Sequence, residues 1–328
     1  MRIETLDQDD AARAWSAVRE RAAAMTPGPA AADKAVPAGW RRLLAWRGGE
    51  PAARLAAGVV EGMAGAPGRT GLVGWYEAAD ADGGVALLRR AREALHGEGA
   101  ERVVGPLNGS TWARYRLALP PEAGAAPPPF LSEPQNPAAY PEHFAAAGFT
   151  PLLDYESRVV GAAQLAAALP ALPLPAGVRV CGLDLGAYDA ELHAIHALSL
   201  AAFAQNPFYT PLGFAAFRAF YERLRPLLDP ALVRLAVADD GALLGFVFAF
   251  ADPWAPPEQP RLVLKTLATA PAARGLGIGA ALTDAVHRQA AARGAAVIHA
   301  LMQCANASLH ISHGRASALF RRYRLYRG

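Results

Sequence analysis

The sequence has few of the residues that typify disulfide-stabilised and membrane proteins. It contains only two cysteines in 328 residues, Cys181 and Cys304, and we expect them in different structural elements. This argues against a disulfide framework, and no histidine spacing fits a standard metal site, so we predict no metal. The longest apolar run, 242–251, is interrupted by Gly245 and is about half as long as a membrane-spanning helix. We therefore expect no membrane partner.

Lysine is almost absent, with Lys34 and Lys265 the only two, and the formal net charge is only +3. Arginine and tyrosine alternate in 320–327, a pattern that could stack on RNA but that a terminal strand with one solvated face also explains. We favour the strand and expect no nucleic-acid partner. Residues 1–7 turn acidic without an apolar stretch, so we expect no secretory signal and a cytoplasmic protein.

The composition predicts a chain with more than one core. It is 53% hydrophobic and 19% charged, which over this length favours two domains. An alanine-rich stretch followed by Pro170, Pro173 and Pro175 is the best linker candidate. We predict domains at 1–160 and 178–328, joined by a linker at 161–177.

Hydrophobic periodicity predicts a similar order of elements in the two halves. The first half has predicted helices at 8–24, 85–97 and 138–147, and predicted strands at 40–47, 53–61, 71–77, 102–105 and 150–160. The second half has predicted helices at 189–204, 213–227 and 277–293, and predicted strands at 232–238, 243–251, 261–268, 296–302 and 319–326. The repeated order suggests a duplicated unit.

These connections predict an α/β fold with two similar domains. Three consecutive strands joined by short turns pair antiparallel, and the following strand–helix–strand step adds a parallel strand. Each domain should thus be a mixed, mainly antiparallel sheet flanked by helices. One local echo supports the duplication, because Asn108 and Ser110 follow the fourth predicted strand of the first half as Asn306 and Ser308 follow its counterpart.

A glycine-rich loop at 272–279 carries the strongest chemical signal. Gly275, Gly277 and Gly279 remove side chains at the start of a helix, where backbone N–H groups can then approach a ligand. Unpaired donors and the positive end of the helix dipole favour an anion. Arg274 adds a forked cation suited to phosphate oxygens, so we expect a pyrophosphate.

Other interpretations of this loop fit less well. Gly275, Gly277 and Ala280 formally satisfy a dinucleotide-binding pattern, but six residues separate the strand from Gly275, and 295–303 contains no acid for a ribose. A Walker loop would need a Gly-Lys-Ser/Thr sequence that is absent here. A glycine-rich helix start that binds nothing is the remaining alternative.

The run from Arg274 to Gly279 resembles the acyl-CoA loop of the GNAT N-acetyltransferase superfamily, R/Q-x-x-G-x-G/A. The apolar strand 262–268 stands where the fourth strand of that family does. The resemblance implies acetyl-CoA or coenzyme A as the cofactor. It implies that main-chain groups of Leu267 and Ala268 hold pantetheine and that the loop holds the pyrophosphate, through Arg274, Gly275, Leu276, Gly277, Ile278 and Gly279.

The first half resembles a degenerate GNAT copy. Its element order fits, and 140–149 looks like the late helix and Gly-Phe of the family. At the expected loop, however, it has Asp80 and Asp82 and no cation, and these acids would repel a pyrophosphate. We therefore expect one CoA site per chain.

The catalytic residues are less clear. Many GNAT enzymes use an acid on the fourth strand as the base and a tyrosine on the late helix as the acid, but no Asp or Glu occurs in 261–283, and 303–310 departs from the family's late helix. Asn306 matches the frequent asparagine after the fifth strand, so it binds the cofactor or a water, or else caps the next helix. For the acid we choose Tyr323, on the last predicted strand.

Two polar and aromatic loops are candidates for the acceptor site. The segment 205–211 links two helices that cover the acceptor pocket in GNAT proteins, and 105–112 has the same character. The substrate-binding candidates are Asn108, Ser110, Trp112, Asn206 and Tyr209. A plain proline-rich turn is the alternative for 205–211.

The leading hypothesis is a tandem GNAT-like N-acyltransferase that uses acetyl-CoA and acts on a small-molecule amine as a monomer or homodimer. A non-catalytic acyl-CoA-binding or sensing protein is a second possibility, because the strand carboxylate is missing. A Fem-like aminoacyl transferase is a third, since such proteins also pair two GNAT-like halves.

Overall fold

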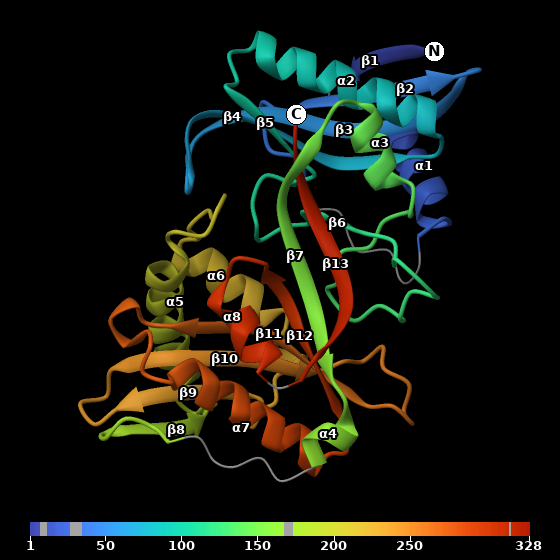
Figure 1. Cartoon of the computed structure of the whole chain (residues 1–328). Helices are drawn as coiled ribbons and strands as arrows, with labels where there is room; N and C mark the ends of the chain where they lie inside the picture. Colours follow the sequence, from blue (N-terminus) through green and yellow to red (C-terminus); the bar gives the residue numbers. More distant parts are fainter. Residues whose placement is uncertain (7–11, 27–34, 167–172, 315) are drawn as a thin grey trace. The chain divides into compact units, whose positions relative to one another are not determined.

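The computed structural model describes residues 1–6, 12–26, 35–166, 173–314 and 316–328 (Figure 1). These residues form two compact units that do not follow one boundary in the chain. The first unit contains 1–154, 206–210 and 322–328, and the second contains 155–205 and 211–321. The predicted boundaries at 160 and 178 thus differ from this division, because strands β7 (Thr150–Val160) and β13 (Ala318–Arg327) each contribute residues to both units. Part of the predicted linker, 167–172, lies outside the described residues.

The first unit is a mixed sheet with the order β1-β2-β3-β4-β5-β13. Its pairs are antiparallel except β4–β5, which are joined through α2 and lie parallel, as predicted. Along the first half of the chain the elements are β1 (Arg2–Leu6), α1 (Ala12–Ala23), β2 (Arg41–Arg47), β3 (Glu50–Met63), β4 (Ala66–Ala78), α2 (Ala81–Gly97), β5 (Arg102–Gly105), β6 (Leu117–Ala118), α3 (Tyr140–Ala146) and β7 (Thr150–Val160).

The second unit repeats this arrangement with the order β8-β9-β10-β11-β12-β7. Again one pair, β11–β12, is parallel and the others are antiparallel. Along the second half of the chain the elements are α4 (Ala162–Ala166), β8 (Val178–Gly182), α5 (Tyr188–Phe203), α6 (Phe214–Glu222), a 3-10 turn (Arg225–Leu227), β9 (Val233–Ala238), β10 (Leu243–Ala251), β11 (Arg261–Thr269), a second 3-10 turn (Pro271–Ala273), α7 (Ile278–Ala292), β12 (Ala296–Gln303), α8 (Ala307–His313) and β13 (Ala318–Arg327).

The last strand of each unit comes from the other half of the sequence. β13 pairs with β5, placing Tyr326 opposite Gly105. β7 pairs with β12, placing Glu156 opposite Met302. Each sheet is therefore completed by a strand that sequence order assigns to the opposite half.

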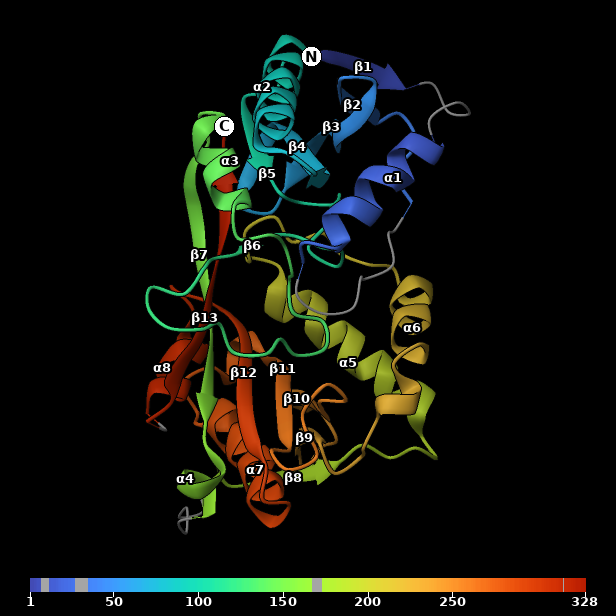
Figure 2. The ribbon, with the colours of Figure 1, turned by 90° about the vertical axis from the view of Figure 1, so that its right-hand side faces the viewer.

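Strand alternation places the cores. In β2, Leu43 and Ala45 pack in the core that includes α2. Leu44 points to the opposite face of the sheet and packs against Val18 of α1. Figure 2 shows α1 and α2 on opposite faces of this sheet. In β10, Val247 and Ala249 belong to the core under α7. Both faces of each sheet are covered, which explains the long apolar runs of β3 and β10.

Several boundaries differ from the predicted ones. The predicted helix at 213–227 ends at Glu222, before the 3-10 turn that contains Pro226. Helix α2 begins at Ala81, four residues before the predicted start, because Asp80 caps it by accepting a hydrogen bond from the N–H of Gly83. The edge strands β1 and β8 and the short helix α8 were not predicted, since such short elements have little periodicity.

Candidate functional site

The glycine loop connects β11 to α7, as the sequence predicts. After the 3-10 turn at Pro271–Ala273 the chain extends at Arg274, and α7 begins at Ile278 with Gly277 as its N-cap. Gly275 and Gly277 have φ of +83° and +79°, a left-handed conformation that favours glycine. The first two glycines are therefore required by the backbone of the loop.

The start of α7 has the properties of an anion site. No side chain caps this helix, and the residues from Arg274 to Gly277 are exposed. Its first N–H groups consequently keep their hydrogen-bonding capacity, at the positive end of a helix of 15 residues. A pyrophosphate fits this donor set.

Gly279 has a different role from the other two glycines. A Cβ atom added there would lie 3.3 Å from Cδ1 of Ile311, on α8. On strand β10, which packs against α7, a Cβ on Gly245 would lie 3.0 Å from Cγ2 of Ile278. Small residues thus let the first turn of α7 pack closely between β10 and α8.

Strand β11 has one free edge next to this loop. Its ladder with β12 pairs Arg261 through Leu264 and ends at Leu264 opposite His299. On its other edge β11 continues to pair with β10 as far as Thr269. From Thr266 onward, main-chain groups on the β12 side, including those of Leu267 and Ala268, have no strand partner among the described residues. Amides of a pantetheine arm fit such an edge.

Lys265 occupies a bulge, which explains why a charged residue interrupts this apolar strand. Thr266 pairs with Phe248 and Leu264 pairs with Ala249, so Lys265 is the extra residue between them.

Arg274 is tied to a neighbouring helix. Its Nη2 donates to the carbonyl oxygen of Ala202 on α5 over 2.9 Å. The residue is exposed, so the other guanidinium N–H groups stay available to an anion.

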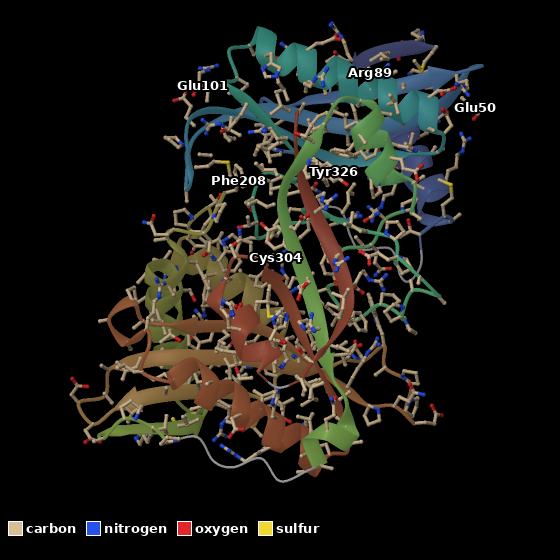
Figure 3. The ribbon with its side chains drawn as sticks, viewed as in Figure 1. Glu50, Arg89, Glu101, Phe208, Cys304 and Tyr326 are labelled. Atoms are coloured by element: carbon tan, nitrogen blue, oxygen red, sulfur yellow. The ribbon has the colours of Figure 1, made fainter. Side chains whose placement is uncertain are left out.

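Asn306 is the N-cap of α8, and its side chain accepts a hydrogen bond from the N–H of Ser308 over 3.3 Å. Capping is one of the two roles that the sequence leaves open. Cys304, labelled in Figure 3, lies exposed just after β12 and is not disulfide-bonded, nor is Cys181.

The corresponding loop of the first unit is built differently. Asp80 caps α2, and Arg47 forms ion pairs with Asp80 and Asp82. A Cβ on Gly84 would lie 2.2 Å from the hydroxyl of Tyr76, so this glycine is needed for packing. A carboxylate therefore takes the helix N–H that an anion would use, which supports the expectation of one CoA site.

The five predicted substrate residues all lie in the first unit, and the structure brings some of them together. Trp112 donates from Nε1 to the carbonyl of Thr210 over 2.9 Å, and its ring lies 6.4 Å from that of Tyr209. Tyr209 N–H donates to the carbonyl of Asn206. The N–H of Phe208, labelled in Figure 3, donates to the carbonyl of Ala64. The segment 206–210 is thus anchored to the first unit.

Asn108 and Ser110 make local contacts. Oδ1 of Asn108 accepts from the N–H of Trp75 over 2.8 Å, and the carbonyl of Ser110 accepts from the N–H of Ala113. The Asn108 amide therefore supports Trp75, whose φ is +51°.

Tyr323 lies in the first unit with a fully buried side chain. Its hydroxyl donates to Oε1 of Glu133 over 2.5 Å. Asn306 belongs to the second unit.

Sequence reasoning did not select a polar cluster on β7. Glu156 is buried and lies within ion-pairing distance of Arg158, at 3.0 Å, and of His313, at 3.5 Å. Two opposite charges at alternate positions of the strand were the available signal. The proximity of Glu156 to His313 of α8 depends on the pairing of β7 with β12, which could not be predicted from the sequence.

The second unit also contains an apolar pocket on the α5 side of its sheet. Tyr188 contributes the polar atom, a buried hydroxyl without a hydrogen-bond partner among the described residues. Burial raises the pKa of Tyr188. The lining residues are Leu183, Tyr188, Leu192, Ile195, Tyr221, Leu228, Val233, Phe246 and Phe248.

Two other site types have no support in the described part of the chain. It contains no group of three or more His, Cys, Asp or Glu side chains arranged to hold a metal ion. Among the same residues, no helix combines the length and apolarity needed to cross a bilayer.

Comparisons with known proteins agree with the loop and the fold. Residues 192–313 match the family model described as the acetyltransferase (GNAT) family. This region includes β11, the glycine loop, α7 and α8. No curated protein matches the sequence.

Solved structures match the whole chain at low sequence identity, which shows the fold alone. A tandem GNAT protein from the clavulanic acid biosynthesis pathway is 15% identical with a TM-score of 0.56, and the match covers 100% of this chain and 98% of that one. Eis1 from Mycobacterium abscessus is 16% identical with a TM-score of 0.53, covering 100% and 73%. A GCN5-related N-acetyltransferase from Anabaena variabilis is 10% identical with a TM-score of 0.56, covering 99% and 72%.

The predicted fold of two GNAT-like domains, each a mixed and mainly antiparallel sheet, is therefore confirmed. The C-terminal region, residues 192–313, matches the GNAT acetyltransferase family, and over its full length the chain has the fold of tandem GNAT proteins.

Proposed function

We propose that the chain transfers an acyl group, acetyl in the first instance, from coenzyme A to the amino group of a small molecule. The observation that carries the proposal is the uncapped, exposed start of α7 directly after the free edge of β11. These features lie within the residues that match the GNAT family model.

The proposed division of labour follows the geometry. N–H groups from Gly275 to Gly279, with Arg274, bind the pyrophosphate. Main-chain groups of Leu267 and Ala268 orient the pantetheine arm along the free edge of β11. Bound in this way, an acyl thioester supplies an activated carbonyl carbon, and the protein has to place an amine against it and remove a proton.

Acceptor recognition is proposed for the first unit. Asn108, Ser110, Trp112, Asn206 and Tyr209 combine amide, hydroxyl and aromatic groups, of which Trp112 and Tyr209 are in contact. Trp112→Ala should then raise the KM for the amine and leave the affinity for acetyl-CoA unchanged. An unchanged KM would remove Trp112 from the acceptor site.

Calorimetry with acetyl-CoA tests the cofactor site. We expect Gly277→Glu to reduce affinity at least tenfold, because it adds a negative charge and a side chain at the N-cap. Gly241→Glu is the matched control, since Gly241 also has positive φ, at +86°, and an added Cβ meets nothing within 4 Å. If both variants bind like the wild type, the proposed site is wrong.

Transfer itself is tested by thiol release from acetyl-CoA with spermidine, glucosamine and tryptamine as acceptors. Release that depends on the amine supports acyl transfer. Tight binding of acetyl-CoA without thiol release would favour a non-catalytic binding protein. The absence of a carboxylate from β11 also favours this alternative. Absence of binding would favour the Fem-like alternative.

A further inference from the structure

The proposed acyl transfer needs a proton acceptor that neither predicted catalytic residue supplies. An amine that attacks a thioester carbon has to lose a proton as the amide forms. β11 carries no carboxylate, and the Tyr323 hydroxyl is buried on Glu133. Asn306 has an amide side chain, which is not a base at neutral pH.

Glu156 lies close to the point where β11 and β12 separate. The β11–β12 ladder ends at Leu264 opposite His299, and Glu156 is opposite Met302, three residues further along β12. Three residues of a strand span about 10 Å. Glu156 is therefore separated by the intervening strand β12 from the free edge of β11, along which we propose that the pantetheine arm lies, and it lies beyond the point where that edge begins.

His313 reaches the same place from α8. It is the last residue of that helix, and its Nε2 lies 3.5 Å from Oε1 of Glu156. The same helix packs on the first turn of α7 through Ile311, next to Gly279. Helix α8 thus connects the pyrophosphate loop to the carboxylate on β7.

The carboxylate is held firmly, whereas the imidazole is accessible. The Glu156 side chain is 11% exposed, and Nη1 of Arg158 donates to its Oε1 over 3.0 Å. Arg158 is fixed in turn by Nε and Nη2 bonds to the hydroxyl and carbonyl oxygens of Ser317. The His313 side chain is 46% exposed. A rigid carboxylate behind an open imidazole orients the ring.

We propose that His313 is the proton acceptor of the acyl transfer and that Glu156 is its positioning residue, an inference that rests on the proposed function. The neutral ring directs its Nε2–H to Glu156, which leaves the lone pair on Nδ1. The amine nitrogen forms the bond to the carbonyl carbon, and the carbon–sulfur bond breaks with its electron pair on sulfur. Nδ1 takes the proton from the nitrogen and returns it to the thiolate or to water.

The placement of His313 is tested with acetyl-CoA alone, by NMR of the histidine ring protons, with His313→Gln used to assign its signal. We expect the His313 signal to shift on saturation with acetyl-CoA, and not to shift when Gly277→Glu is titrated over the same range. An unchanged His313 signal in saturated wild-type protein would overturn the placement. This measurement requires no amine.

The chemical role is tested by thiol release with an amine that supports turnover. His313→Gln should lower kcat about 100-fold, within the range typical of general-base catalysis, and keep the affinity for acetyl-CoA within threefold. Added imidazole should restore part of the turnover of His313→Ala. Glu156→Gln should shift the acid limb of the pH–rate profile to higher or lower pH, and His310→Gln, on the same helix, should leave kcat unchanged.

Two kinds of failure are distinguishable. If the wild type releases no thiol from acetyl-CoA with any amine, the proposed acyl transfer is wrong, and so is the proposed role of His313. If the wild type is active and His313→Gln is equally active with an unchanged pH profile, only the assignment of His313 is wrong.

Discussion

The Tyr323 hydroxyl donates a hydrogen bond to Oε1 of Glu133 over 2.5 Å, and both side chains are buried. Glu133 also accepts from the N–H of Phe130 at Oε2. The contact joins the last strand of the chain to a loop of the first unit. This position suits a structural role better than a role in proton transfer, which requires access to a substrate.

Tyr323→Phe should therefore destabilise the first unit without stopping turnover. Removing the hydroxyl deprives a buried carboxylate of a donor, which costs about 1–3 kcal/mol of unfolding free energy. Urea unfolding measures the loss, and kcat should stay within about threefold of the wild type. A loss of more than 100-fold in kcat with unchanged stability would restore Tyr323 as the catalytic acid.

A buried ion pair in the first unit provides a second prediction. Nε of Arg54 lies 2.8 Å from Oε2 of Glu77, and the Arg54 side chain is 1% exposed, with its guanidinium 4.7 Å from the centre of the Trp15 ring. Glu77→Ala leaves this cation buried without its carboxylate, so the free energy of unfolding should fall by about 3–5 kcal/mol. Chemical denaturation gives the value.

The matched variant is the double substitution Arg54→Met with Glu77→Leu. Since it removes both charges and keeps the volume, it should recover most of the stability that Glu77→Ala loses. A double variant as unstable as the single one would mean that the pair contributes through geometry rather than charge.

The third prediction concerns pH. Nδ1 of His143 lies 2.7 Å from the hydroxyl of Tyr76, and burial lowers the pKa of His143 below its ordinary 6.5. The unfolded chain then binds a proton that the folded chain does not, between that lowered pKa and 6.5. The unfolding free energy of the first unit should accordingly decrease as pH falls below 6.5, and it should not change through this group above 6.5.

Urea unfolding at several pH values between 5 and 7.5 measures this dependence. His143→Gln should flatten it, and His310→Gln, at an exposed position, should retain it. The same slope in His143→Gln as in the wild type would assign the effect to other groups.

The fourth prediction concerns Arg274, whose guanidinium donates one hydrogen bond, from Nη2, to the carbonyl oxygen of Ala202. Arg274→Gln removes a charged donor from the proposed pyrophosphate site. A hydrogen bond to a charged group contributes about 1.5–3 kcal/mol, so the Kd for acetyl-CoA should rise roughly 10- to 100-fold, and kcat should change little. Calorimetry at two salt concentrations checks this, with Arg293→Gln as the control. A loss of affinity that is equal in both variants would contradict a direct contact.

The sequence alone was sufficient for the glycine loop and the order of elements. The roles of Gly275 and Gly277 can be predicted from the local sequence, because a left-handed backbone at the start of a helix depends on the residues at those positions. The parallel pairs β4–β5 and β11–β12 follow from a strand–helix–strand connection of limited length. Such features require no knowledge of distant contacts, which is why they were predicted.

Only the tertiary structure decided which strand completes each sheet and which polar groups meet. The pattern of β7 predicts a strand but not its partner, since main-chain hydrogen bonds are the same for any neighbour. Its pairing with β12 brings Glu156 to His313, 157 positions apart in the sequence (313 minus 156). Likewise, burial against Glu133 distinguishes Tyr323 from an exposed tyrosine. The chain encodes the glycine loop locally, whereas the proximity of Glu156 and His313 depends on packing between distant segments.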